Sequence, residues 1–274
     1  MEELKLRGYV TPEDFDGTDT EKIQKAIDTA AEEDIRKVII EKDYEVTETV
    51  KIPAGMEIKL TKGVTVKAAG CTLFENAVLG DDSKASYSFE DQWIYLLGAE
   101  NSKFVGDVKF FHAGNIIIED VVLDGSLTFE FCREIRMERD TINAPENAVT
   151  IMRGSNNYIM QYNTFNAKNC ALIADTALKE GPYVIGKDED IHELIVRENT
   201  FNAETAFFVG STPDSKVFNV QYDHTKVTGK GIVIGREGET LEKTQYFNLT
   251  ATDFTGATAE VVKNNETMHC YFGN

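Results

Sequence analysis

The sequence has 274 residues, and its 28 lysine and arginine residues are outnumbered by 47 aspartate and glutamate residues, which gives a formal net charge of -19. Such a charge repels the phosphate backbone of nucleic acids and anionic membrane surfaces unless a local basic patch intervenes, and the sequence contains no such patch. It also opposes tight binding of a polyanionic polymer, unless a cation bridges the charges or a few arginines gather in one groove.

We expect the chain to form one domain, residues 1–274. Hydrophobic residues make up 42% of it, and the 5 prolines and 20 glycines form no linker or low-complexity stretch. No apolar stretch follows the charged residues at the amino terminus, and no run approaches the length of a transmembrane helix. These features predict a cytoplasmic protein with no membrane partner.

An amphipathic helix is predicted within residues 14–33. Thr18 or Asp19 can serve as its N-cap, and apolar residues recur at helical spacing on one face, at Ile23, Ala26, Ile27 and Ala30. Strands are predicted over residues 38–274, and a stack of strands exposes unpaired backbone groups at its ends. We therefore expect this helix to cap the first coil.

Four aromatic residues gather shortly before the repeats begin, at Tyr87, Phe89, Trp93 and Tyr95. They could stack on sugar rings. However, the alternation after Trp93 is typical of a strand, so packing in the core is the preferred interpretation.

The rest of the chain repeats roughly every 25 residues, and three columns of the repeat are wholly apolar or aromatic. The anchor column is Leu123, Ile142, Phe165, Phe201, Val227 and Phe254. The columns five and seven residues earlier are Ile118, Met137, Met160, Val196, Tyr222 and Leu249, and Ile116, Ile135, Tyr158, Leu194, Val220 and Phe247. The column four before the anchor is polar, so each segment alternates like a half-buried strand.

Asparagine, aspartate and threonine dominate the positions on either side of the anchor. The column two before it is Val121, Asp140, Asn163, Asn199, Thr225 and Thr252, and the column just after it is Asp124, Asn143, Asn166, Asn202, Thr228 and Thr255. Such residues tolerate the left-handed backbone conformation and can satisfy backbone groups at a bend. Both columns are therefore predicted to form turns.

A second apolar strand follows each turn, at residues 149–151, 171–173, 207–209, 232–234 and 261–262. Two strands per repeat with an Asn-rich corner indicate an all-β fold, a right-handed parallel β-helix whose stacked coils enclose one apolar column. The second strand also places Ile173, Phe208 and Val233 outward. An outward apolar stripe predicts a cover, either the insertion described next or another subunit in a homo-oligomer.

An insertion at residues 178–191 lengthens one coil to 36 residues. Long loops on rigid scaffolds often carry function, and this one could wall a groove beside Asp175, His192 and Arg197. Its acidic run, residues 188–190, could bind calcium, but it lacks the glycine and alternate spacing of a calcium loop, so a solvated turn is favoured. We expect no metal site and no cofactor.

The cysteines are widely scattered and include no C-x-x-C pair and no histidine at ligand spacing. They are expected to be small core residues rather than disulfides or zinc ligands: Cys71, Cys132, Cys170 and Cys270.

Several segments resemble proteins of the pectin-lyase-like superfamily, which holds pectate lyases, polygalacturonases and phage tailspikes. The opening from Asp14 to Gly70 carries the resemblance in its D-G-T-D helix and in residues 38–40, 44–46, 52–55 and 64–66, while residues 96–106 are similar to the central rung of polygalacturonases. The resemblance implies the β-helix and a site on the outside of the coils. The N-T-D, D-D, G-H-G and R-I-K signatures of polygalacturonases are not matched, since Asp81 and Asp82 come too early and no G-H-G occurs.

Adjacent coils bring polar columns together on one outer surface. Arg139, Glu198, Asp223 and His224 are the candidate catalytic residues, and Glu138, Tyr162, Arg197, Asp175 and His192 are the candidate substrate-binding residues. Cleavage of a sugar chain needs two carboxylates across the bond, or a base beside a cation that stabilises a carboxylate. An ordinary surface ladder of arginine and glutamate remains the alternative.

The sequence leaves two functions open. The first is a lyase or hydrolase that acts on a carbohydrate polymer or oligomer at this surface. The second is a non-catalytic β-helix that binds glycans or serves as a structural, tailspike-like module. The missing signatures favour the second, and the resemblance favours the first.

Overall fold

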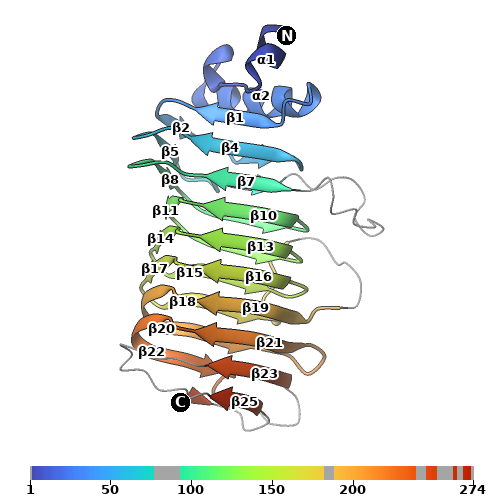
Figure 1. Ribbon diagram of the computed structural model, residues 1–274, viewed down its shortest axis with the longest axis vertical. Coiled ribbons are helices and arrows are strands. Elements are labelled where there is room, and N and C mark those ends of the chain that lie inside the picture. Colours follow the sequence, from blue (N-terminus) through green and yellow to red (C-terminus); the bar gives the residue numbers. More distant parts are fainter. Residues whose placement is uncertain are drawn as a thin grey trace.

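The computed structural model describes residues 2–76, 93–181, 188–238, 245–251, 262–263 and 268–272. Within these residues, parallel strands stack into a solenoid, and the helices lie at its amino-terminal end (Figure 1). The predicted all-β parallel β-helix is confirmed.

The strands form two sheets. The 10-stranded sheet runs in the order β1 (Lys37–Ile40), β4 (Met56–Leu60), β7 (Ile94–Leu97), β10 (Gly114–Glu119), β13 (Arg133–Glu138), β16 (Asn156–Gln161), β19 (Ile191–Arg197), β21 (Lys216–Asp223), β23 (Gln245–Ala251) and β25 (Met268–Phe272). The 15-stranded sheet begins with β2 (Tyr44–Val46), β5 (Thr65–Ala68), β8 (Lys103–Val105), β11 (Val122–Asp124), β14 (Thr141–Ala144), β17 (Thr164–Ala167) and β20 (Thr200–Gly210). It returns through β18 (Cys170–Asp175), β15 (Asn147–Met152), β12 (Leu127–Glu130), β9 (Val108–Phe111), β6 (Phe74–Asn76) and β3 (Val50–Ile52), while β22 (Lys226–Ile234) pairs with β20 and with β24 (Val262–Lys263).

The amino-terminal cap consists of α1 (Glu2–Arg7), the 3-10 turn η1 (Pro12–Asp14) and α2 (Asp19–Glu32). The predicted helix is confirmed, but it starts at Asp19 rather than 14. Thr18 is the N-cap, because its hydroxyl accepts the backbone N–H of Glu21. The predicted apolar face, Ile23, Ala26, Ile27 and Ala30, is fully buried.

The coils from β1–β3 to β16–β18 contain three strands each rather than the predicted two, whereas the next two coils contain two, because β20 and β22 each run through the positions of both the second and the third strand. One coil, for example, comprises β10, β11 and β12, and the anchor Leu123 sits in the middle strand, β11. The residues just after the anchors are therefore not turns: Asp124, Asn143 and Asn166 lie inside β11, β14 and β17. Only two or three residues separate these strands from their neighbours, which is why a short strand looks like a bend in sequence.

The three predicted apolar columns form the core. Every member whose side chain the structure describes is at most 5% exposed, while Phe254 and the side chain of Phe247 lie outside the described part. Strand partners keep these columns in register, as in Ile118 beside Met137 and Met137 beside Met160. Complete removal of such side chains from water contributes about 1.5–3 kcal/mol each.

The column two before the anchor forms a buried inner ladder. Oδ1 of Asp140 accepts the N–H of Val121 at 2.9 Å, and Oδ1 of Asn163 accepts the N–H of Asp140 at 2.8 Å. Oδ1 of Asn199 likewise accepts the N–H of Asn163 at 2.9 Å. As predicted, these side chains satisfy backbone groups at the corner.

The left-handed conformation falls one residue earlier than predicted. The residues with positive φ at this corner are Asp120, Arg139, Tyr162, Glu198 and His224. Most of them have no intrinsic preference for that conformation, which costs about 1–2 kcal/mol per residue. The ladder beneath them imposes the bend, and the bend points these five side chains away from the core.

Two smaller predictions differ in outcome. Cys132 and Cys170 are buried and free, as expected, whereas Cys71 is half-buried and the side chain of Cys270 lies outside the described part. The expected core packing of the aromatic cluster is wrong for Trp93 and Tyr95, because Ile94 and Leu96 take the inward positions of β7. Tyr87 and Phe89 lie outside the described residues.

Candidate functional site

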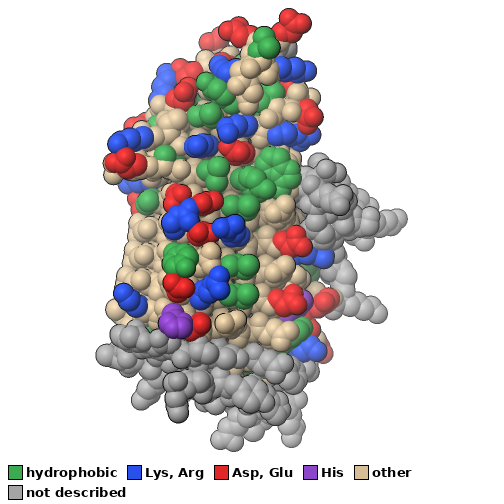
Figure 2. Space-filling model, in the orientation of Figure 1, with side chains coloured by type: hydrophobic (Ala, Val, Ile, Leu, Met, Phe, Trp, Pro, Cys, Tyr) green, Lys and Arg blue, Asp and Glu red, His purple; other side chains and the backbone are tan. Residues whose placement is uncertain are grey.

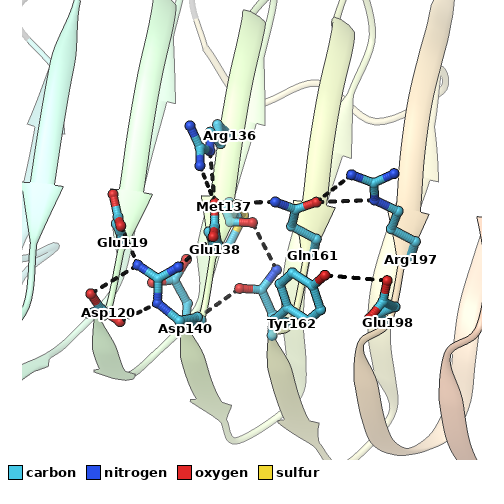
Figure 3. A network of polar contacts seen from close by, with 12 residues as sticks. Glu119, Asp120, Arg136, Met137, Glu138, Asp140, Gln161, Tyr162, Arg197 and Glu198 are labelled. Atoms are coloured by element: carbon cyan, nitrogen blue, oxygen red, sulfur yellow. Dashed lines mark hydrogen bonds and ion pairs between the residues drawn. The ribbon is translucent and has the colours of Figure 1, made fainter.

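Arg139 is the centre of a polar network at the corner of the 10-stranded sheet. Figure 3 shows its partners Glu119, Asp120 and Glu138 on neighbouring strands. Its Nε donates to Asp120 at 2.8 Å, and its two terminal nitrogens pair with Glu119 and Glu138. Asp120 and Glu119 together raise the pKa of Arg139. Because three carboxylates already surround this guanidinium, it has little freedom to neutralise a carboxylate on a ligand.

Glu138 is engaged on all sides as well. Arg136 donates Nε to it at 3.0 Å and lowers the pKa of its carboxyl, and Gln161 donates Nε2 at 3.2 Å. With Arg139 as a further partner, Glu138 is a buried acceptor held in the charged form. This arrangement suits a fixed structural carboxylate.

The next two coils are more open. Arg197 donates Nε and Nη2 to Oε1 of Gln161, at 3.1 and 2.7 Å, and no described residue contacts its Nη1. Tyr162 is 50% exposed, and its hydroxyl lies 3.4 Å from Oε1 of Glu198. The exposed ring of Tyr162 and the guanidinium of Arg197 thus belong to neighbouring coils of the same corner.

A surface depression of about 480 Å³ opens beside this tyrosine, and we call it the corner depression. Its lining comprises Tyr162, Glu198, Asn199, Thr200, His224 and Lys226. His224 is oriented by its neighbour, since Nδ1 lies 2.5 Å from Oδ1 of Asp223. Figure 2 shows acidic and basic side chains gathered on one face of the solenoid.

The structure therefore brings together part of the predicted site. Tyr162, Glu198 and His224 line one depression, and Asp223 supports His224. Lys226 and Thr200, which sequence reasoning did not select, complete the lining. Both could have been recognised as outward-facing candidates from the sequence, because they stand next to the anchors Val227 and Phe201 and residues beside an inward anchor point outward.

Asp175 and His192 lie elsewhere. Asp175 is buried at the end of β18 in the other sheet, where it pairs with Arg236 and accepts the N–H of Ala177 at 2.9 Å. His192 is at the start of β19 and stacks on Phe218, with ring centroids 4.7 Å apart. Arg197 is at the far end of that strand, about 16 Å away at the usual rise per residue. The predicted groove of these three residues does not form.

The described ends of the insertion, residues 178–181 and 188–191, contact the 15-stranded sheet. Glu130, 1% exposed, accepts Nε of Arg153 at 2.8 Å and the N–H groups of Glu180 and Gly181 at 2.9 and 2.6 Å. The acidic run joins the same cluster, because Glu189 pairs with Nη1 of Arg153 at 2.7 Å. Sequence reasoning missed the burial of Glu130, because strand alternation alone assigns its side chain to solvent.

Ile173, Phe208 and Val233 do point outward and are half-buried, as predicted. Arg236 covers part of the stripe, with its guanidinium carbon 5.9 Å from the ring centre of Phe208. Among the described residues, no three histidine, cysteine, aspartate or glutamate side chains gather as possible metal ligands. None of the described helices is long and apolar enough to span a membrane.

Sequence comparison finds no protein-family model and no curated protein that match the chain. Comparison of structures finds a family 28 exopolygalacturonase of Yersinia enterocolitica, with a TM-score of 0.60 and 10% identity over 97% of this chain and 77% of that one. It also finds PfbA, a surface adhesin of Streptococcus pneumoniae, with a TM-score of 0.51 and 12% identity over 97% of this chain and 93% of that one. At these identities the likeness establishes the fold alone, the predicted parallel β-helix.

Proposed function

We propose that the protein binds a carbohydrate on the outer face of its 10-stranded sheet, with the corner depression as the primary subsite. The observation that carries this proposal is Tyr162, an aromatic ring 50% exposed beside Glu198, His224 and Lys226. Sugars are bound by an aromatic face that stacks on the ring and by charged side chains that hydrogen bond to hydroxyls. The fold shared with an exopolygalacturonase is consistent with a carbohydrate ligand.

Other ligand classes fit less well. The net charge of -19 disfavours nucleic acid, and the depression is an open surface without the enclosed apolar lining that small hydrophobic ligands need. Lys226 has no acidic partner among the described residues, and Arg197 keeps one free terminal nitrogen, so two donors are available for hydroxyl oxygens.

The binding test uses the pair Tyr162→Ala and Tyr162→Phe with a panel of oligosaccharides. Loss of the ring should weaken binding about two- to tenfold, whereas loss of the hydroxyl alone should change it little, because stacking contributes about 0.5–1.5 kcal/mol. The matched control is Phe218→Ala, which removes a partly buried aromatic ring near the start of β21, at the opposite end of the strands from Tyr162. Affinities that Tyr162→Ala leaves unchanged would place the ligand elsewhere.

Catalysis is the second candidate function, and the 2.5 Å contact between His224 and Asp223 favours it. An imidazole oriented by a carboxylate can exchange protons at its other nitrogen, and Glu198 lies in the same depression. Release of reducing sugar and absorbance of unsaturated products should then appear on a polysaccharide panel and vanish in Glu198→Gln with Asp223→Asn. Binding without turnover on the whole panel would establish the non-catalytic form.

A further inference from the structure

The outer face of the 10-stranded sheet carries a continuous lengthwise strip. Its members occupy the central outward position of six successive strands, where the register aligns Tyr95, Ile117, Arg136, Ile159, Ile195 and Gln221. Four of the six are apolar or aromatic, and those four are half-buried rather than hidden. Outward positions of a solvent-facing sheet normally hold polar residues, so a row of this kind calls for an explanation.

A polar column runs parallel to the strip, two residues further along each strand. It consists of Glu119, Glu138, Gln161, Arg197 and Asp223, while the aligned position on β7 is the apolar Leu97. Beyond the polar column lies the corner column with Tyr162. The face is therefore mainly apolar along one line, which Arg136 interrupts, and rich in hydrogen-bonding groups along the next. Figure 3 shows the hydrogen-bonding groups on neighbouring strands.

From this juxtaposition we propose that the face binds a neutral glycan chain lying along the axis of the solenoid, from the corner depression toward Trp93 and Tyr95. The inference rests on the proposed function and adds the class, direction and minimum length of the ligand. Sugar rings have an apolar face and an equatorial rim of hydroxyls, which matches a strip beside a polar column. Trp93 and Tyr95, with ring centroids 4.7 Å apart, form the aromatic end of the track.

The charges select the class of glycan. The polar and corner columns with Arg136 contain five carboxylates, Glu119, Asp120, Glu138, Glu198 and Asp223, against three guanidinium groups, Arg136, Arg139 and Arg197. Arg136 and Arg139 already pair with carboxylates of the network. A chain of uronic acids would meet net repulsion along this track, whereas neutral sugars would meet donors and acceptors without that cost.

The geometry also disfavours a peptide. In the middle of a sheet the backbone N–H and C=O groups bond to neighbouring strands, so this face offers side chains only. An extended peptide would have to satisfy its own backbone groups on a half-apolar surface. The distance from Tyr95 to Tyr162 along the axis is three strand spacings, about 14 Å, so a disaccharide cannot touch both ends.

The experiment exploits Trp93, the one tryptophan in the sequence. Di- and hexasaccharides of glucose, mannose, xylose and galacturonic acid are titrated while tryptophan fluorescence and calorimetric affinity are recorded. At least one neutral hexasaccharide should change the fluorescence and bind about tenfold more tightly than its disaccharide, as expected for an added aromatic contact. The galacturonate hexamer should bind more weakly than the neutral one.

Variants separate the track from the subsite. Tyr95→Ala should remove the advantage of the hexasaccharide and leave the disaccharide unaffected, while Tyr162→Ala should weaken both. Ile117→Thr, which keeps a β-branched side chain on the strand, repeats the test without removing an aromatic ring, and Tyr9→Ala is the aromatic control in the amino-terminal cap.

Each contrary result has a distinct meaning. Equal affinity for the two lengths with silent fluorescence, or preference for the galacturonate hexamer, would overturn the neutral track while the corner depression stands. Binding of an unrelated extended peptide to the track in place of every glycan would also overturn it. Failure of every glycan to bind, with Tyr162→Ala without effect, would overturn the proposed function itself.

Discussion

Asp140 donates its backbone N–H to Oδ1 of Asn163 at 2.8 Å, and the two residues occupy successive steps of the inner ladder. Asn163 also donates Nδ2 to the carbonyl of Met137 at 3.1 Å. Oδ2 of Asp140, the corresponding atom one step earlier, is buried and has no hydrogen-bond partner among the described residues. Burial raises the pKa of Asp140 well above its usual value, so the folded protein favours the charged form of this carboxyl less than water does.

Asp140→Asn should therefore stabilise the protein, and more strongly at high pH. An acid whose folded pKa is raised makes the folded state lose stability as pH rises from about 4, its unfolded pKa, toward the folded value. We expect a gain of about 1–3 kcal/mol near pH 8 and a smaller one near pH 4, measured by urea unfolding. Asn163→Asp is the mirror control and should destabilise only at the higher pH; identical pH profiles for all three proteins would contradict the assignment.

A second ladder of side-chain hydrogen bonds, the outer ladder, joins Asp124, Asn143, Asn166 and Asn202. The inner and outer ladders should differ in their contribution to stability. Asn199, 1% exposed, accepts the N–H of Asn163 and donates to the carbonyl of Met160, so Asn199→Ala leaves buried backbone groups unsatisfied. We expect a loss of about 2–4 kcal/mol in the free energy of unfolding. Asn202→Ala, which breaks only the amide contact with Asn166 on the outside, should cost about 1 kcal/mol. A comparable loss in both variants would argue against this difference.

The insertion should depend on one buried ion pair. Arg153→Ala leaves the carboxylate of Glu130 buried without its cation, and we expect about 3–5 kcal/mol of destabilisation. Glu130→Leu combined with Arg153→Met should recover most of this loss. Hydrogen exchange reports the local effect. The amides of Glu180 and Gly181 should lose protection in Arg153→Ala, where the Glu130 carboxylate has lost its cation, and in the double variant, where that carboxylate is absent. Unchanged protection would show that the loop is held by other contacts.

Two glycines with similar φ give a matched test of packing. Gly154 has φ +67, and a Cβ there would lie 2.1 Å from Cδ1 of Phe131. Gly63 has φ +78 with no atom within 4 Å of the Cβ position. Gly63→Ala should cost about 1–2 kcal/mol from backbone strain alone, and Gly154→Ala should cost about 1–3 kcal/mol more through overpacking. Thermal unfolding of the two variants measures the difference directly, and equal losses would mean that Phe131 moves aside freely.

The core was predictable because inward positions recur at fixed distances from each anchor. The corner was harder to place. Arg139, Tyr162 and Glu198 adopt the left-handed conformation because the buried side chains that follow them hold the chain there, so propensities pointed to the wrong columns. The short strand β14 was interpreted as a turn for the same reason. Asparagine favours turns in general, but Asn143 lies in a strand, where its side chain accepts a hydrogen bond from Asn166 of the next coil.

The candidate site was predictable only to the level of columns. Stacking alone places Tyr162 beside Glu198 and Glu198 beside His224, and the structure confirms that neighbourhood. It could not reveal that Arg139 binds three carboxylates, because that depends on side-chain reach across two coils. Asp175 was misplaced for a related reason: the 178–191 insertion leaves the stack at the other sheet, and sequence spacing does not say on which side a loop emerges.

The inner ladder repeats one pattern at Asp140, Asn163 and Asn199, in which Oδ1 of each side chain accepts the backbone N–H of the ladder residue one coil earlier. Coils with this pattern can therefore stack directly on one another. Excision of residues 140–162 would place Oδ1 of Asn163 beside the N–H of Val121 and preserve the pattern of hydrogen bonds. The length of the solenoid is set by the number of coils, independently of which side chains any one coil exposes. A protein built this way can become longer or shorter by duplication or loss of a segment, while the structure of each remaining coil stays the same.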